Sequence, residues 1–201
     1  SSPETELGYW QLSSSCDGIT EACKALETPV TGGNVSLYNE SKNEKNQISP
    51  IKPTPVIGMV GIINNVEKAI SSKWKNINDQ IWIIGSYKSE TTIAASSYLE
   101  YFHGQITGRP PKIDLVDEKF CQGFLRDSIS KGFVVSSHDI SDGGLAIALA
   151  ECCILSSKGA TIELQEDFNR DDNLLFGEGG SRIIFSIDNI KEKEWHNYLK
   201  E

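Results

Sequence analysis

The chain has 201 residues, of which 38% are hydrophobic, and 19 Lys and Arg stand against 28 Asp and Glu, a net charge of −9. This hydrophobic content excludes a wholly disordered chain, and the acidic balance disfavours nucleic acid and anionic membranes as partners. No apolar run is long enough to span a bilayer and the N-terminus lacks the pattern of a signal peptide, so we expect a cytoplasmic protein.

The first part of the chain predicts one helix and several strands. In chain order we expect a helix over residues 15–26 capped by Ser15 or Asp17, a strand–turn–strand over 29–38, a loop over 41–53 and a buried strand over 54–63. The following stretch is polar and loop-like, which is typical of a connection between domains. We therefore place a domain boundary within this stretch, residues 64–80.

In the second part, helices alternate with strands. The expected elements are a strand over 81–87, a turn at 108–111, a helix over 115–132, a strand over 133–137, a helix over 145–157, a strand over 160–164, an acidic loop over 165–173, a strand over 182–187 and a final helix from 191. Such alternation predicts an α+β fold, in which helices pack on a mixed β-sheet.

The first candidate site is TGGNVS, residues 31–36. Gly32 and Gly33 carry no Cβ atom, so a polyphosphate can approach the main chain there. Asn34 offers an amide oxygen that suits Mg²⁺, and Ser36 faces the same side as Asn34 if the segment is a strand. The same residues are also common in a plain hairpin turn, and the residues alone favour that turn.

The second candidate site lies in SSHDISDGG, residues 136–144. Here a strand ends, Asp139 and Asp142 follow, and Gly143 and Gly144 precede a helix whose N-terminus favours anions. The two aspartates could hold a metal ion against a phosphate. The alternative, which the residues favour, is a capped helix with Ser141 or Asp142 as N-cap and glycines that allow close packing.

Two further patterns are weaker. In FGEGGSR, residues 176–182, the glycines and Arg182 could bind phosphate, but the residues favour the alternative, a flexible turn before a strand. The chain has three scattered histidines, His103, His138 and His196, and no motif that predicts a catalytic triad. His138 beside Asp139 is the one suggestive pair, and it is more typical of a strand-end histidine held by hydrogen bonds.

In their order and spacing these stretches resemble the PurL family of phosphoribosylformylglycinamidine synthases, in the AIR synthetase superfamily. The segments that carry the resemblance are SPETELGYWQLSSSCDGITEACKALETPVTGGNVSLYNES, TPVIGMVG, HGQITGRPP, SSHDISDGGLAIALAE and LFGEGGSRIIFSI. The resemblance implies that residues 1–76 are the end of a second AIR synthase N-terminal-like (A) domain. It implies that residues 77–201 are most of a second AIR synthase C-terminal-like (B) domain, so we expect truncation at both ends.

The same resemblance implies an activity and a set of site residues. Members of the family convert formylglycinamide ribonucleotide, ATP and glutamine-derived ammonia to formylglycinamidine ribonucleotide in purine biosynthesis, with the glutaminase PurQ and with PurS as partners. It implies that Gly33 contacts ATP, Asn34 binds Mg²⁺ and Ser36 contacts the substrate. The family's catalytic histidine lies in the first A domain, so we expect no catalytic residue here and no activity from this chain alone.

A second, auxiliary nucleotide site is implied less directly. Asp139 resembles a metal-binding aspartate of the first copy of the domain, and in this second copy it is either vestigial or part of an auxiliary nucleotide site that is largely structural. The auxiliary candidates are Gly32, Asp139, Asp142, Gly143 and Gly144. Two other interpretations stay open. The chain could belong to another ATP-dependent enzyme of the superfamily, such as aminoimidazole ribonucleotide synthetase, although PVTGGNVSLYNE argues against it. It could also be a non-catalytic binding or scaffold domain.

Overall fold

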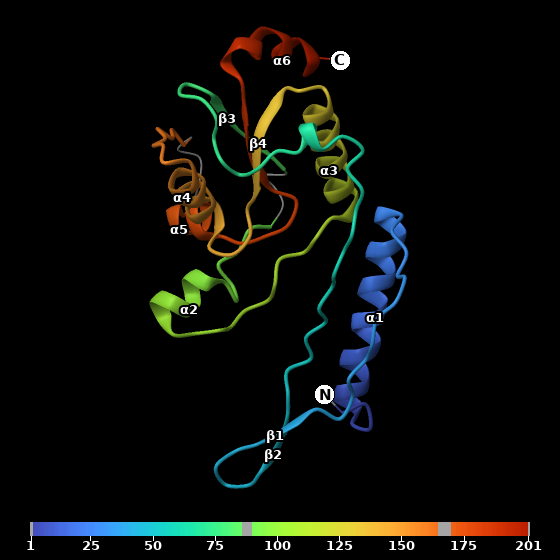
Figure 1. Cartoon of the computed structure of the whole chain (residues 1–201). Coiled ribbons are helices and arrows are strands. Elements are labelled where there is room, and N and C mark those ends of the chain that lie inside the picture. Colours follow the sequence, from blue (N-terminus) through green and yellow to red (C-terminus); the bar gives the residue numbers. More distant parts are fainter. Residues whose placement is uncertain (1, 86–89, 165–169, 201) are drawn as a thin grey trace. The chain divides into compact units, whose positions relative to one another are not determined.

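The computed structural model describes residues 2–85, 90–164 and 170–200 (Figure 1). Contacts between residues divide the chain into two compact units, Ser1–Ile62 and Ile63–Glu201. This division lies before the boundary that we predicted at residue 76, because Ile70 and Trp74 pack into the core of the second unit. No helix in the described part of the chain is both long and apolar enough to cross a membrane.

The first unit contains one long helix, α1 (Glu6–Leu26), and a small hairpin of β1 (Glu40–Lys42) and β2 (Ile48–Pro50). The predicted helix is confirmed, but its predicted start at residue 15 is wrong. The hydroxyl of Thr5 accepts a hydrogen bond from the Gly8 amide at 3.1 Å and caps the helix, so helical structure begins a further two and a half turns upstream.

Two strand predictions in this unit are wrong. Residues 29–38 form no strand, and the hairpin turn lies within the predicted loop, where the side chain of Asn43 accepts hydrogen bonds from the amides of Lys45 and Gln47. Residues 54–63 form no strand and are exposed, with 88% exposure of Val56 and 92% of Ile62. Their apolar pattern is typical of burial, but in the described part of this unit no strand pairs with them.

The second unit is built on a three-stranded antiparallel sheet of β3 (Gln80–Ile84), β4 (Val134–Asp139) and β5 (Ile183–Ile187), in the order β3-β5-β4. The α+β prediction is confirmed, although the described strands all pair antiparallel and not in mixed directions. The predicted strand over 160–164 is wrong, because those residues pair with no strand of the described sheet. The predicted strand over 81–87 and acidic loop over 165–173 lie partly outside the described residues.

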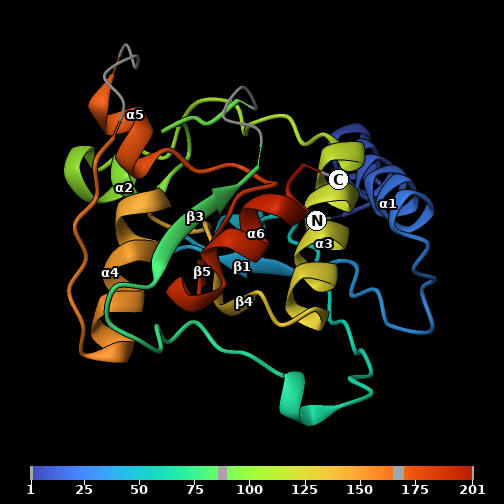
Figure 2. The same cartoon turned by 90° about the horizontal axis from the view of Figure 1, so that it is seen from above.

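Helices cover both faces of this sheet (Figure 2). The helices of this unit are α2 (Ser97–His103), α3 (Leu115–Ser130), α4 (Gly144–Ser156), α5 (Asp171–Phe176) and α6 (Glu192–Tyr198), of which α3, α4 and α6 pack on the sheet, and 3₁₀ turns lie at Val66–Lys68 and Asn189–Lys191. The helices predicted over 115–132, over 145–157 and from 191 are confirmed. Asp114 caps α3 through hydrogen bonds from the Val116 and Asp117 amides, at 2.8 and 3.0 Å.

The core of the second unit has two parts, one on each face of the sheet. On one face α4 packs through Leu145 and Cys152 against Ile184 of β5. On the other face α3 and α6 pack against Phe185, and Trp195, which is only 1% exposed, lies at the centre of this cluster. Successive residues of β5 therefore point to opposite faces, both of them buried, which explains the nearly continuous apolar run of that strand.

Candidate functional site

Residues 31–36 lie in an irregular, exposed stretch of the first unit. The amide nitrogen of Asn34 donates a hydrogen bond to the hydroxyl of Ser36 at 3.4 Å, so the two predicted ligand side chains lie next to each other. That bond uses Nδ2 and leaves the amide oxygen, the atom that a Mg²⁺ ion would need, outside the contact. The hairpin turn that the residues alone favoured is not formed here.

The glycines of this stretch are not required by packing within the structure. A Cβ atom added at Gly32 or Gly33 would have no neighbour within 4 Å. The φ of Gly33 is +157°, which other residues rarely adopt, so its backbone conformation accounts for glycine there, whereas neither packing nor conformation requires glycine at position 32. The oxygen donors of Asn34 and Ser36 fit Mg²⁺ and phosphate, but they are too few for a complete site, and the described residues contain no metal-binding cluster of His, Cys, Asp or Glu.

Residues 139–144 connect β4 to α4 in the second unit, and the predicted cap at Ser141 or Asp142 is wrong. The N-cap of α4 is Gly143, which makes no side-chain capping bond, and its amide donates to the Glu178 carboxylate at 2.9 Å. Close packing does explain Gly144, because a Cβ atom there would lie 2.7 Å from the backbone of Phe176. Asp142 is exposed.

The pair of His138 and Asp139 is held by hydrogen bonds, as the alternative interpretation predicted. His138 Nδ1 lies 3.2 Å from Asp139 Oδ1, and its Nε2 lies 2.9 Å from Glu151 Oε2. Burial acts to raise the pKa of Asp139, but hydrogen bonds from Ser141, from its own backbone and from His138 outweigh it and lower the pKa. Since both ring nitrogens of His138 face carboxylates, the imidazole is not placed as a base or a metal ligand.

Arg182 does not present its guanidinium group to solvent as a phosphate ligand would require. Its side chain is 7% exposed, and Nη2 donates to the carbonyl oxygen of Gly177 at 2.6 Å. Burial lowers the pKa of this guanidinium group. The neighbouring Ser181 donates to the Glu118 carboxylate at 2.8 Å, so this turn is fastened from two sides.

None of the five cysteines forms a disulfide in the structure. Cys152 is 1% exposed, and burial, together with Cys153 and Glu151, raises the pKa of its thiol to about 11. A thiol with that pKa is almost entirely protonated at neutral pH, which makes Cys152 a core residue and not a nucleophile.

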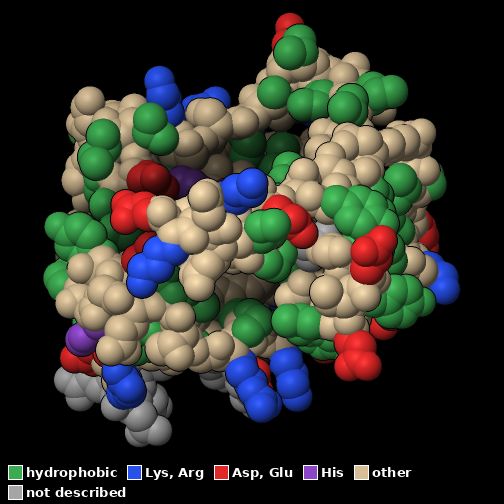
Figure 3. All heavy atoms as spheres, turned by 90° about the horizontal axis from the view of Figure 1, so that it is seen from below, with side chains coloured by type: hydrophobic (Ala, Val, Ile, Leu, Met, Phe, Trp, Pro, Cys, Tyr) green, Lys and Arg blue, Asp and Glu red, His purple; other side chains and the backbone are tan. Residues whose placement is uncertain are grey.

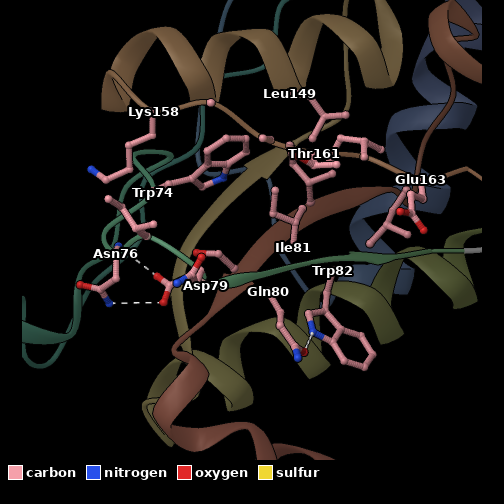
Figure 4. Close-up of a pocket in the computed structure, with 18 of the residues that line it drawn as sticks. Trp74, Asn76, Asp79, Gln80, Ile81, Trp82, Leu149, Lys158, Thr161 and Glu163 are labelled. Carbon is pink, nitrogen blue, oxygen red and sulfur yellow. Dashed lines mark hydrogen bonds between the residues drawn. The ribbon is translucent and has the colours of Figure 1, made fainter.

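The sequence did not predict the pocket of about 1230 Å³ that lies between β3 and residues 157–164 (Figure 4). Trp74, Ile81 and Leu149 give it apolar walls, and Lys158 and Glu163 add charge. Among the lining residues, Asn76 donates hydrogen bonds to the Asp79 carboxylate from its backbone amide and from its side-chain amide. No predicted site residue lines this pocket. Seen from below, hydrophobic side chains lie at the surface among both acidic and basic groups (Figure 3).

The sequence also missed Glu178, the residue that links the predicted second site to the third. Its one distinguishing signal was an acidic residue within a run of glycines, GEGG. The structure brings Glu178 to Gly143, whereas residues 31–36 belong to the other unit.

Comparison with known proteins gives clear sequence relatives. The chain is 84% identical over its 201 residues to the phosphoribosylformylglycinamidine synthase subunit PurL of Prochlorococcus marinus strain MIT 9312. It is 81% identical to that of strain MIT 9301 over 201 residues and 50% identical to that of strain MIT 9313 over 207 aligned positions. In each case the whole chain is matched but only 26% of the relative, so the chain spans about a quarter of their length.

Among solved structures, Thermotoga maritima PurL complexed with FGAR matches 64% of this chain and 23% of its own, at 18% identity and a TM-score of 0.49. T. maritima PurL complexed with ATP matches 67% of this chain and 21% of its own, at 17% identity and a TM-score of 0.47. The model of the family described as AIR synthase related protein, C-terminal domain, matches residues 76–201. Since that match covers more than half of the sequence, the chain belongs to the family of AIR synthase related proteins, through their C-terminal domain.

Proposed function

We propose that this chain is part of a PurL subunit of phosphoribosylformylglycinamidine synthase, an ATP-dependent ligase of purine biosynthesis. The observation that carries the proposal is the 84% identity to a protein of that name, which extends over all 201 residues. In this proposal the substrates are formylglycinamide ribonucleotide, ATP and ammonia from glutamine. PurQ and PurS are the partners, and the complex acts in the cytoplasm.

The proposal assigns a place in the subunit to each part of the chain. Residues 1–76 form the end of a second A domain, and residues 77–201 form most of a second B domain. The match of the C-terminal family model, which begins at residue 76, supports this division. In this proposal, catalysis of the complete reaction needs residues outside the chain.

Within the first unit, we assign Gly33 to contact with ATP, Asn34 to Mg²⁺ and Ser36 to the substrate. The neighbouring positions of Asn34 and Ser36, and the open space around Gly33, are compatible with these roles. When bound, Mg²⁺ would neutralise phosphate charge during phosphoryl transfer. The chain's own contribution is to bind and orient, because amide and hydroxyl groups do not act as bases at neutral pH.

The test is the substitution Asn34→Ala in the full-length subunit. We expect the kcat/KM for Mg-ATP to fall roughly 10- to 100-fold, as is usual when metal coordination is disturbed. The free energy of unfolding should change by less than about 0.5 kcal/mol, because the side chain is exposed. Steady-state kinetics and chemical denaturation measure the two quantities.

Asn43→Ala is the matched control. Its side chain accepts two backbone hydrogen bonds in the β1–β2 turn, so it should lower stability and leave Mg-ATP use unchanged. If Asn34→Ala behaves like this control, the segment is only structural. Turnover of formylglycinamide ribonucleotide by the isolated 201-residue chain would also contradict the proposal.

A further inference from the structure

One carboxylate oxygen joins the starts of two helices in the second unit. Glu178 Oε1 accepts a hydrogen bond from the amide of Ser97, the first residue of α2, at 2.8 Å. The same atom accepts a hydrogen bond from the amide of Gly143, the N-cap of α4, at 2.9 Å. The three residues are far apart in sequence, so this contact is a purely tertiary link.

The backbone holds Glu178 in position for this contact. Its amide donates to the Thr92 carbonyl oxygen at 3.0 Å, and its own carbonyl oxygen accepts from the Thr92 amide at 3.1 Å. One residue earlier, the carbonyl oxygen of Gly177 accepts from the buried guanidinium group of Arg182. Because these bonds hold the backbone of Gly177 and Glu178, less conformational entropy is lost when the carboxylate binds the two amides.

The contact also places a negative charge beside the first amides of α2 and α4. The first amides of a helix have no partner within the helix and carry partial positive charge. Neither Ser141 nor Asp142 caps α4. Glu178 therefore provides the charge that the predicted capping residues do not.

We propose that Glu178 acts as a latch, which fastens α2 to α4 and keeps residues 139–144 closed. While it is engaged, the Gly143 amide is used internally, so it cannot donate to a phosphate at the predicted auxiliary nucleotide site. This inference concerns the second unit alone and does not depend on the roles proposed for Gly33, Asn34 and Ser36. Its failure would leave those roles untouched, and the reverse is also true.

Glu178→Gln in the 201-residue chain tests the latch, because it keeps the size of the side chain and removes the charge. Amide hydrogen exchange followed by NMR should show Ser97, Gly143 and the amides of α2 exchanging about tenfold or more faster, in line with the loss of one charge-assisted contact. The amides of Ile184 and Phe185 in β5 should be unchanged, since the sheet does not depend on the latch.

Glu118→Gln is the matched control. Glu118 is a carboxylate that holds the same turn through Ser181, at 2.8 Å, but the structure gives it no bond to the start of α2 or α4. Its substitution should leave exchange at Ser97 and Gly143 within about twofold of the wild type. An equal effect of both variants, or equal acceleration in β5, would overturn the latch and indicate general destabilisation.

A second measurement does not rely on any variant. Inorganic phosphate is added to the wild-type chain, and the NMR chemical shifts of the Gly143 and Ser97 amides are followed. With the latch engaged, neither shift should change in a saturable way. Saturable shifts at both amides would show that phosphate reaches them in competition with Glu178, and the claim that the loop is closed would be wrong.

Discussion

The two units of this chain use similar apolar sequences with opposite results. Every buried hydrophobic residue in the described part of the chain belongs to the second unit, where IIFSI forms β5 between β3 and β4. In the first unit TPVIGMVGI, residues 54–62, is just as rich in β-branched residues, yet Val56, Val60 and Ile62 are almost fully exposed. An apolar pattern makes a segment suitable for burial. Whether the segment is buried depends on neighbouring strands and helices that pack against it.

The largest test of this difference compares two tryptophans. Trp195 is 1% exposed and contacts the rings of Trp82 and Phe185, with centroids 5.6 and 5.7 Å away, whereas Trp10 in α1 is 64% exposed. We expect Trp195→Ala to lower the free energy of unfolding by about 3–5 kcal/mol, because it leaves a cavity in the core. Trp10→Ala should cost less than about 0.5 kcal/mol.

Chemical denaturation of the 201-residue chain, followed by far-ultraviolet circular dichroism, measures both values. If Trp195→Ala is too unstable to purify, Trp195→Phe should show a smaller loss in the same direction. Comparable losses for Trp10→Ala and Trp195→Ala would mean that the first unit has a core of its own, and the comparison between the units would fail.

A smaller effect is expected from a buried hydroxyl pair in the sheet. The Oγ atoms of Ser136 and Ser186 lie 2.6 Å apart, and both residues are at most 1% exposed. Ser136→Ala leaves the hydroxyl of Ser186 without that partner, so we expect a loss of about 1–3 kcal/mol. The double variant Ser136→Ala/Ser186→Ala should cost less than the sum of the two single variants, because no unpaired hydroxyl remains.

Ser41→Ala is the matched serine of the first unit. Its hydroxyl donates to the Ser49 carbonyl oxygen at 3.4 Å across the exposed hairpin, where water can replace it. The free energy of unfolding, measured by chemical denaturation, should therefore stay within about 0.5 kcal/mol of the wild-type value. Additive losses for Ser136 and Ser186 would contradict a direct interaction between them.

The contrast between the units also explains which elements the sequence could predict. The helices α3 and α4 and the strands β4 and β5 are supported by local patterns that agree with their tertiary surroundings, and they were predicted. The strands expected over 29–38, 54–63 and 160–164 had the local pattern without a paired neighbour in the structure. A sequence pattern cannot state whether the partner strand is present.

The candidate sites also differ in how far the sequence could predict them. Residues 31–36 were identified from their chemistry, but the roles of Gly33, Asn34 and Ser36 rest on family resemblance, since the residues alone favoured a turn. Glu178 could not be predicted, because its contacts with Ser97 and Gly143 depend on how distant segments come together. Long-range hydrogen bonds have no periodic signal in sequence.

The smallest expected effect concerns Asp127 on the surface of the second unit. Hydrogen bonds from Lys131 and then Tyr198, at 2.8 and 2.7 Å, hold the pKa of this carboxyl group below its usual 3.8. A folded pKa below the unfolded value means that the contribution is present above about pH 3.8 and is lost as the pH falls through the folded pKa. Asp127→Asn should therefore lower stability slightly at pH 7, and this difference from the wild type should narrow below pH 3.8. Denaturation at pH 7 and pH 3 measures it. A loss of stability at pH 7 as large as that of Trp195→Ala would show that surface charge, and not apolar burial, stabilises the second unit. We do not expect that result, because ion pairs at the surface are weakened by water.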